Sequence, residues 1–252
     1  MKPDTMKVAA HRGFSGRYPE NTMLAFRKAV EEGADEIELD VQLSKDGQVV
    51  VFHDESLERL TGIKGWIRDY SFDELVKFDT AKIVFGNRHG FNPIPSLEEY
   101  FSWVRNTGIV TNIELKNGRF YYEGLEEKTI ELISRFGLEE RVFFSSFNHV
   151  SLMKCKKIKP VIRCGVLVGG GMAPGNPGYY VRSNGLDFYH PDIKSVNDEV
   201  VANCKTHEVG INVWTVDDMD SLLKMQEWGC RGVITNFPGM CGKCVKGNGD
   251  RG

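Results

Sequence analysis

The sequence predicts a (β/α)₈ barrel of the TIM type. Eight short segments rich in Val, Ile and Phe recur at fairly even intervals along 252 residues, and helix-like segments separate most of them. Strands that alternate with helices imply a parallel sheet, and eight such units in a chain of this length imply a closed barrel. Several segments lack polar alternation, which is typical of strands covered on both faces. We expect residues 1–252 to form one domain.

The predicted elements follow one another in a regular order. The eight strands are expected at residues 7–10, 36–41, 109–114, 141–145, 162–167, 186–189, 210–214 and 232–235. Helices are expected at residues 20–32, 96–105, 123–136, 148–158, 197–207 and 218–228. The segment 96–105 begins with Ser96, a good helix cap, and Glu98 and Glu99 follow in the first turn, where negative charge is stabilising.

A hairpin is predicted directly after the second strand. Asp46-Gly47 separates two apolar-rich runs, and this dipeptide favours a two-residue type I′ turn, which needs positive φ at both positions. The pairs expected from that turn are Lys45 with Gln48, Val41 with Phe52, and Asp40 with His53. Because Glu38 and Asp40 are two residues apart, their side chains leave one face of the strand. The hairpin would therefore gather two carboxylates and an imidazole, although an exposed hairpin with a polar face is the simpler alternative.

Three segments depart from the strand–helix order. Residues 55–95 are too long for an ordinary βα loop, and we expect an insertion above the barrel mouth with one short helix at 71–78. Residues 169–178 are rich in Gly and Pro without periodicity, which predicts a mobile loop. The tail from Gly239 is expected to be disordered.

Composition narrows the functional classes. The chain is 41% hydrophobic and 27% charged with a net charge of −3, and it has no basic stripe with interleaved aromatics, so no nucleic-acid partner is expected. No apolar run suits a signal peptide or a membrane span, which predicts a cytoplasmic protein without stable membrane association. Six cysteines are too few for a disulfide scaffold. Cys241-x-x-Cys244 lacks a second pair, so free thiols are favoured over a zinc site. Nothing in the sequence indicates an oligomeric state.

Ionisable residues gather at the predicted C-terminal ends of three neighbouring strands, where barrels of this type carry their active sites. The first strand ends in His11-Arg12-Gly13, the second carries Glu38 and Asp40, the third ends in Glu114-Leu115-Lys116, and the hairpin returns at His53. Three carboxylates at close range need a cation, or one must be protonated. Oxygen-only ligands select Mg²⁺ or Ca²⁺ over zinc. A salt-bridge cluster with Arg12 and Lys116 is the alternative.

Two histidines and two cations complete the predicted site. An unperturbed imidazole has a pKa of about 6.5, so His11 and His53 could divide into one neutral and one charged ring, as a general base and a general acid require. Arg12 suits bidentate contact with a phosphate, and Lys116 would act as a point charge. Together these groups describe phosphoryl transfer without a protein nucleophile. The sequence contains neither a Gly-x-Ser-x-Gly motif nor a phosphate-binding Gly-rich loop.

The order of these motifs resembles that of the glycerophosphodiester phosphodiesterases. The matching motifs are His11-Arg12-Gly13, Pro19-Glu20-Asn21-Thr22, Glu38-x-Asp40, His53-Asp54, Glu114-x-Lys116 and Trp214. Each motif alone is weak, but together they are specific and span nearly the whole chain. The resemblance implies a TIM-type barrel with an insertion after His53. It also implies hydrolysis of glycerophosphodiesters to an alcohol and sn-glycerol 3-phosphate, in glycerol and lipid metabolism.

The resemblance also implies roles for individual residues. It implies that His11 and His53 are the acid–base pair, that Glu38, Asp40 and Glu114 hold Ca²⁺ or Mg²⁺, and that Arg12 and Lys116 hold the phosphate. Glu20 and Asn21 lie near the site in the family, although local capping of the first helix explains them equally well. Trp214 would form an apolar wall, with a place in the barrel core as the equal alternative. The family commonly has Thr-Asp-x-Pro after the last strand, where this chain carries the neutral Asn236.

Three other functions compete with this interpretation. A lysophospholipase D would act on lipid-like diesters, and the lack of a membrane anchor weighs against it. A catalytically silent barrel would only bind ligands, which the filled catalytic positions disfavour. A zinc amidohydrolase would need a His-x-His pair on the first strand, where the chain has His11-Arg12-Gly13. The leaving alcohol and the choice between direct hydrolysis and a cyclic phosphate intermediate stay open.

Overall fold

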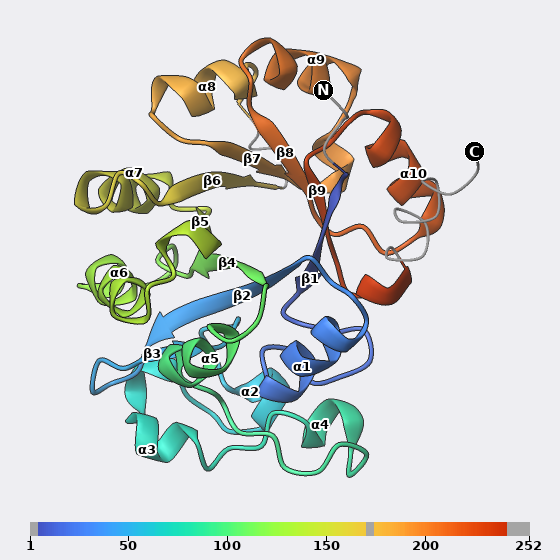
Figure 1. The fold of residues 1–252 in the computed structure, drawn as a ribbon. Coiled ribbons are helices and arrows are strands. Elements are labelled where there is room, and N and C mark those ends of the chain that lie inside the picture. Colours follow the sequence, from blue (N-terminus) through green and yellow to red (C-terminus); the bar gives the residue numbers. More distant parts are fainter. Residues whose placement is uncertain (1–4, 170–173, 241–252) are drawn as a thin grey trace.

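Eight parallel strands close into a barrel, which confirms the predicted fold class (Figure 1). The structure is a computed structural model that describes residues 5–169 and 174–240. The barrel strands are β1 (Lys7–His11), β2 (Glu36–Leu43), β4 (Val110–Leu115), β5 (Val142–Ser146), β6 (Arg163–Val168), β7 (Phe188–Pro191), β8 (Gly210–Val213) and β9 (Gly232–Thr235). Neighbouring strands follow the chain, and pairing of β1 with both β9 and β2 closes the ring. Each strand lies within two residues of its predicted position.

Helices surround the barrel, as Figure 1 shows. Six lie where the sequence predicts them: α1 (Met23–Glu31), α5 (Leu97–Val104), α6 (Leu125–Phe136), α7 (His149–Ile158), α9 (Asp198–Thr206) and α10 (Met219–Glu227). The sequence reading missed α8 (Pro177–Ser183), which begins inside the segment predicted to be a loop and is too short to show helical periodicity. Two single turns, η2 (Glu139–Arg141) and η3 (Ile193–Ser195), complete this layer. The expectations for 170–173 and for 241–252, including Cys241-x-x-Cys244, lie outside the described residues.

The hairpin after β2 differs from the prediction by one residue. Strand β3 (Val49–Val51) runs antiparallel to β2, with Val41 opposite Val51 rather than opposite Phe52. A shift of one residue matters in a strand because it exchanges the two faces. The predicted pairing across this hairpin is therefore wrong.

The turn itself explains the shift. Ser44 and Gln48 close a loop of three residues, with the Ser44 N–H donating to the Gln48 carbonyl at 3.0 Å. Within that loop only Gly47 has a positive φ, of 77°, whereas the predicted type I′ turn needs two such residues. As a result, His53 does not pair with Asp40 in the ladder and lies just beyond the end of β3.

Residues 55–95 lie beside the barrel (Figure 1). Together with Val50 and Phe52 they form a second, smaller hydrophobic core. The segment contains α2 (Glu58–Thr61), η1 (Ile67–Asp69), α3 (Phe72–Leu75), which lies inside the predicted short helix, and α4 (Lys82–Phe85). The buried residues of the smaller core are Val50, Phe52, Leu57, Leu60, Ile67, Leu75 and Ile94. Val51 packs in the barrel core, whereas Val50 and Phe52 pack in the smaller core. His53, the next residue, therefore lies where the two cores meet.

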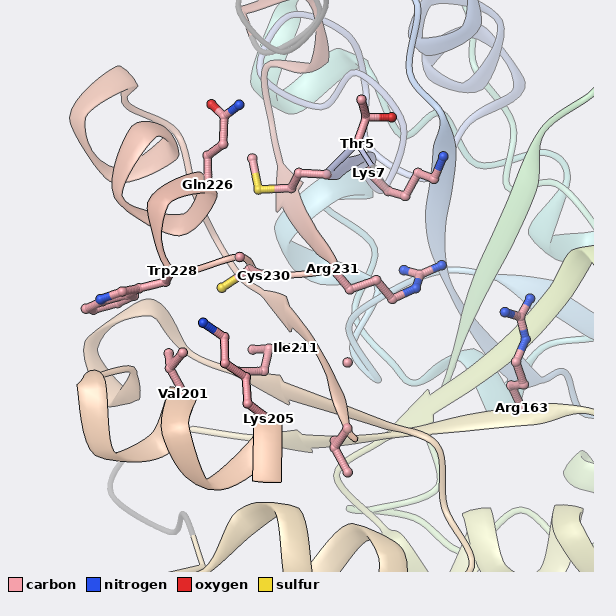
Figure 2. A pocket seen from close by; sticks show the side chains of 14 residues that line it. Thr5, Lys7, Arg163, Val201, Lys205, Ile211, Gln226, Trp228, Cys230 and Arg231 are labelled. Atoms are coloured by element: carbon pink, nitrogen blue, oxygen red, sulfur yellow. The ribbon is translucent and has the colours of Figure 1, made fainter. Parts of the chain in front are cut away.

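The N-terminal end of the barrel contains a cavity of about 740 Å³ (Figure 2). Arg231 closes this end from within, because its guanidinium pairs with Glu36 at 2.6 Å and donates to the Asn212 side chain at 2.8 Å. The same group lies over the rings of Phe143 and Phe188. Glu36 neutralises the charge of Arg231, and the two rings pack against its side chain. Such contacts are typical of a residue that stabilises the fold. Among the described helices, none combines the length and apolar character that a bilayer crossing needs.

Candidate active site

Three carboxylates converge at the C-terminal end of the barrel. Glu38 and Asp40 lie on β2 and Glu114 lies on β4, directly beside Asp40 in the strand register. All three residues are buried, and one oxygen of each lies within 4.8 Å of the others. Alternate residues of a strand share one face, so the Glu38-x-Asp40 spacing turns both side chains into the barrel. The structure thus brings together the three residues that the sequence singled out.

The three carboxylates shift one another's pKa values, and one of their oxygens lacks a hydrogen bond. Burial and the neighbouring Asp40 and Glu114 carboxylates raise the pKa of Glu38 well above its usual value. Burial also pushes the Asp40 pKa upward, but the charges of His53, Lys116 and Arg12 outweigh it and hold that pKa well below its usual range. Asp40 Oδ1 is buried and has no hydrogen-bond partner within residues 5–169 and 174–240. A set of oxygen ligands with excess negative charge and an unpaired buried oxygen fits a hard divalent cation.

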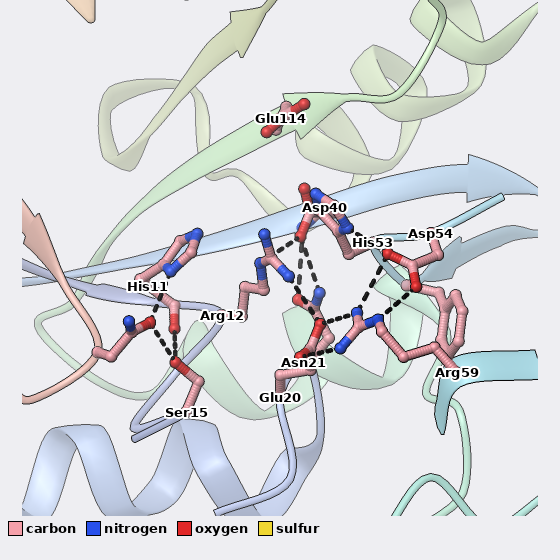
Figure 3. Close-up of polar contacts among 12 residues, drawn as sticks. His11, Arg12, Ser15, Glu20, Asn21, Asp40, His53, Asp54, Arg59 and Glu114 are labelled. Atoms are coloured by element: carbon pink, nitrogen blue, oxygen red, sulfur yellow. Dashed lines mark hydrogen bonds and ion pairs between the residues drawn. The ribbon is translucent and has the colours of Figure 1, made fainter. Parts of the chain in front are cut away.

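His11, at the end of the first strand, is held by hydrogen bonds that reach Asn236 after the last strand (Figure 3). Its Nδ1 lies 2.7 Å from Asn236 Oδ1, which also accepts a hydrogen bond from Ser15. The Asn236 amide nitrogen donates to Asp217 at 2.6 Å. Because a carboxylate only accepts, this contact fixes the amide orientation, so Asn236 Oδ1 must accept from a protonated Nδ1 of His11. The Nε2 atom then keeps its lone pair, and burial together with Arg12 lowers the pKa of His11 to about 4.

His53 has a charged partner instead. Its Nδ1 lies 2.6 Å from the carboxylate of Asp54, the next residue (Figure 3). Arg59 of α2 binds the other Asp54 oxygen at 2.5 Å and continues to Glu20 at 2.8 Å. Burial would raise the Asp54 pKa, but hydrogen bonds from His53 and Arg59 keep that pKa well below its usual range. The two imidazoles therefore differ: an amide oxygen faces one ring and an ionised carboxylate faces the other.

Glu20 and Asn21 contact the site rather than the end of the first helix. Glu20 accepts a hydrogen bond from Arg12 at 2.8 Å, and the Asn21 amide donates to Asp40 at 2.8 Å. The helix is capped by Thr22, whose hydroxyl accepts from the backbone of Ala25. Local capping by Glu20 or Asn21, the alternative weighed from the sequence, is therefore not observed.

The two predicted phosphate-binding cations lie against the carboxylates. Lys116 Nζ is 2.9 Å from Glu114 and 3.8 Å from Asp40, and Arg12 Nε is 3.6 Å from Asp40. Arg12 Nε is buried without a hydrogen-bond partner among the described residues. These ion pairs are the alternative that the sequence left open, and they coexist with the acidic cluster.

A pocket of about 320 Å³ connects these groups. His11, Arg12, Glu38, His53 and Glu114 line one part of it. The apolar part consists of Phe147, Leu167, Trp214 and Ile234. The Trp214 ring meets Phe147 edge to face at 5.8 Å and donates from Nε1 to the His190 carbonyl, so it forms a pocket wall and not barrel core. 

Sequence reasoning missed several contributors to this site. Asp54 follows His53 and was part of a quoted motif, but it was given no role. Asn236 was noted only as a departure from the family pattern. Ser15, Asp217 and Arg59 carried no local signal, because each has a partner far away in the chain, as the separation of 221 residues between Ser15 and Asn236 illustrates.

The fold and the pocket together define a (β/α)₈-barrel protein with two imidazoles and a cluster of carboxylates at the C-terminal mouth. A family model described as the glycerophosphoryl diester phosphodiesterase family matches residues 11–240. A glycerophosphodiester phosphodiesterase of Bacillus altitudinis is 43% identical over 235 residues, covering 92% of this chain and 95% of that protein. One from Caldanaerobacter subterraneus is 41% identical over 231 residues, covering 92% and 94%.

A solved structure points the same way. A phosphodiesterase of Oleispira antarctica, in complex with the product sn-glycerol-3-phosphate, superposes with a TM-score of 0.83 at 29% identity. The match covers 95% of this chain and 96% of that one. The chain therefore belongs to the glycerophosphoryl diester phosphodiesterase family, as its motifs suggested, and it is an enzyme of that class.

Proposed function

We propose that the protein hydrolyses glycerophosphodiesters to an alcohol and sn-glycerol 3-phosphate with His11 and His53 as the acid–base pair. The observation that carries the proposal is the single pocket lined by both imidazoles and by Glu38 and Glu114. Relatives with the corresponding name and the product-bound neighbour support the substrate class.

The cation of this reaction would be Ca²⁺ or Mg²⁺, held by Glu38, Asp40 and Glu114. The donor set supports a hard divalent ion because all three ligands are carboxylates and Asp40 Oδ1 has no hydrogen-bond partner among the described residues. When bound, such an ion supplies electrostatic stabilisation to a phosphodiester oxygen. Arg12 Nε and Lys116 would add positive charge at the same phosphate, and Trp214 would cover the organic part of the substrate.

The two imidazoles have separate tasks in this proposal. His11 acts as the base, because its Nδ1 carries the proton toward Asn236 and its low pKa, about 4, leaves Nε2 free at neutral pH. It takes the proton of the nucleophile, which is water or the neighbouring glycerol hydroxyl. His53 acts as the acid and donates its Nε2 proton to the departing alcohol oxygen as the P–O bond breaks, with Asp54 stabilising the protonated ring.

Turnover of glycerophosphocholine tests the proposal. We expect release of choline and sn-glycerol 3-phosphate, loss of activity after EDTA, and recovery with Mg²⁺ or Ca²⁺. Activity that is indifferent to chelation would refute the cation assignment. Faster turnover of lysophosphatidylcholine in a parallel assay would favour a lysophospholipase D. Calorimetric binding of either diester without turnover would favour a silent binding protein.

The cytoplasmic location, the single-domain organisation of 1–252, and the absence of nucleic-acid and membrane partners stay predictions from the sequence. Cell fractionation and a vesicle sedimentation assay would test the location and the membrane prediction directly.

A further inference from the structure

The floor of the active-site pocket carries polar atoms without partners. Asn112 on β4 and Ser145 on β5 both line the pocket, and each is only 1% exposed. Both side-chain polar atoms of Asn112 and the hydroxyl of Ser145 are buried without a hydrogen-bond partner within residues 5–169 and 174–240. Asn112 lies beside Glu38 in the strand register, and Ser145 lies beside Glu114. These unpaired atoms therefore line the same pocket as the carboxylates of Glu38 and Glu114.

Two comparable buried polar residues nearby, Ser146 and Asn212, have hydrogen-bond partners. Ser146, the next residue on β5, donates to the Leu115 carbonyl at 2.8 Å. Asn212, also inside the barrel, contacts His190 with its amide nitrogen and accepts from Arg231 with its oxygen. An unmade hydrogen bond at a buried group costs about 1–3 kcal/mol, so such groups normally have a partner. The missing partners of Asn112 and Ser145 are expected to come from a molecule in the pocket.

The chemistry of the two side chains indicates what that molecule presents. An amide and a hydroxyl both donate and accept, and neither carries charge, so they complement an alcohol hydroxyl better than a phosphate. Asn112 lies two residues before Glu114 on one face of β4, roughly 7 Å nearer the N-terminal end of the strand. A group that reaches it must extend inward from the phosphate and the carboxylates. The free end of a glycerol moiety has this reach and this chemistry.

We propose that Asn112 and Ser145 bind the terminal hydroxyl of the glycerol moiety and select glycerol-bearing diesters. This inference rests on the proposed function and adds a specificity determinant to it. A pocket that pairs its buried polar groups with a substrate hydroxyl discriminates strongly against an analogue that lacks the hydroxyl, because the protein groups are then left unpaired.

Ordered water is the alternative partner. Asn112 also borders a small enclosed space beside His190, whose Nδ1 is likewise unpaired among the described residues. A water molecule held there would stabilise the fold without reading the substrate. The two possibilities differ in whether removal of the side chain changes the preference between two substrates.

The test compares glycerophosphocholine with an analogue made from propane-1,2-diol, which keeps the hydroxyl next to the phosphate and lacks only the terminal one. We expect the wild-type protein to prefer glycerophosphocholine about 10- to 100-fold in kcat/KM. Asn112→Ala and Ser145→Ala should lose most of this preference, by slowing glycerophosphocholine while leaving the analogue nearly unchanged. Ser146→Ala, whose hydroxyl contacts only backbone, is the matched control and should keep the preference.

Equal losses on both substrates, or no loss in either variant, would overturn the inference and leave the proposed function intact. Failure of the wild-type protein to hydrolyse glycerophosphocholine would instead overturn the proposed function itself. Ser145→Ala removes a single oxygen and keeps the test decisive if Asn112→Ala does not fold. As a readout without turnover, calorimetry should show that both variants bind sn-glycerol 3-phosphate more weakly but inorganic phosphate unchanged.

Discussion

The two ends of the barrel use charge in opposite ways. At the N-terminal end the cavity is larger, about 740 Å³ against 320 Å³, yet the charge of the half-buried Arg231 is paired with the buried Glu36 and hydrogen-bonded to Asn212. At the C-terminal end Glu38, Asp40 and Glu114 crowd together. Cavity size therefore does not identify the site in this molecule. A better indicator of the site is a group of like-charged side chains at close range beside buried polar atoms that lack hydrogen-bond partners.

This contrast has a thermodynamic meaning. A matched pair of charges does not oppose folding, whereas three crowded carboxylates that Arg12 and Lys116 only partly neutralise oppose folding until a cation binds. We therefore expect substitutions at the C-terminal end to change activity more than stability and those at the N-terminal end to do the reverse.

The largest effect is expected from His53→Ala. Loss of the proposed general acid should lower kcat about 1,000-fold, while the free energy of unfolding changes little because the ring lies at the pocket rim. Steady-state kinetics and denaturant titration measure the two quantities. His207→Ala, at the residue that follows α9 and outside the pocket, serves as the control. Near-normal turnover of His53→Ala would remove this residue from the mechanism.

Arg231→Met should show the opposite pattern at the other end of the barrel. It leaves the buried Glu36 carboxylate without its partner, which should lower the free energy of unfolding by about 3 kcal/mol. The kcat/KM for glycerophosphocholine should stay within about twofold, since Arg231 lines no part of the active-site pocket. A large loss of activity at unchanged stability would break the proposed division between the ends.

Divalent cations should stabilise the protein by relieving the carboxylate repulsion. Binding at 100 times Kd is worth about 2.7 kcal/mol. The effect should grow with pH, because the raised pKa of Glu38 means that a proton competes with the cation under mildly acidic conditions. Thermal unfolding with Ca²⁺ or Mg²⁺ at several pH values measures this. Glu38→Gln should weaken the shift, and Glu98→Gln on the exposed face of α5 should not. A shift that is the same in both variants would contradict the assigned ligands.

A smaller effect concerns His190, which is buried beside Asn112 and Asn212 inside the barrel. Burial, with a further contribution from Arg231, lowers its pKa to about 3, so between that value and about 6.5 the unfolded chain binds the proton and the folded chain does not. Stability should therefore fall as pH decreases through this window, by up to about 1.4 kcal/mol per pH unit for this one group. Denaturant titrations between pH 4 and 7 should show a shallower slope for His190→Gln. An identical slope would mean that His190 is already charged in the folded protein.

The strands and the acidic cluster could be predicted because their signals are local. Apolar runs mark the buried strands, and two-residue spacing places Glu38 and Asp40 on one face. The hairpin register could not be fixed in this way, because one dipeptide is compatible with loops of two or three residues and Gly47 alone takes positive φ. Helix α8 is too short for a periodic pattern to stand out.

The residues that hold the site in place by hydrogen bonds could not be predicted from the sequence, for a different reason. Asp217 and Asn236 meet at a loop–strand junction, and Arg59 reaches Glu20 from the insertion. No local pattern marks such pairs, since they exist only after distant segments have packed together. The unpaired state of Asn112 was equally invisible, because a buried Asn on a strand most often has a partner.

The contact between His11 and Asn236 has a consequence during protein synthesis. The two residues are separated by 225 positions and sit beside the first and last strands of the ring. A nascent chain from which β9 has not yet emerged therefore carries an imidazole that lacks its partner. Catalytic competence should appear only when the ninth strand docks against the first, so the onset of turnover in a stalled-translation series would report completion of the fold.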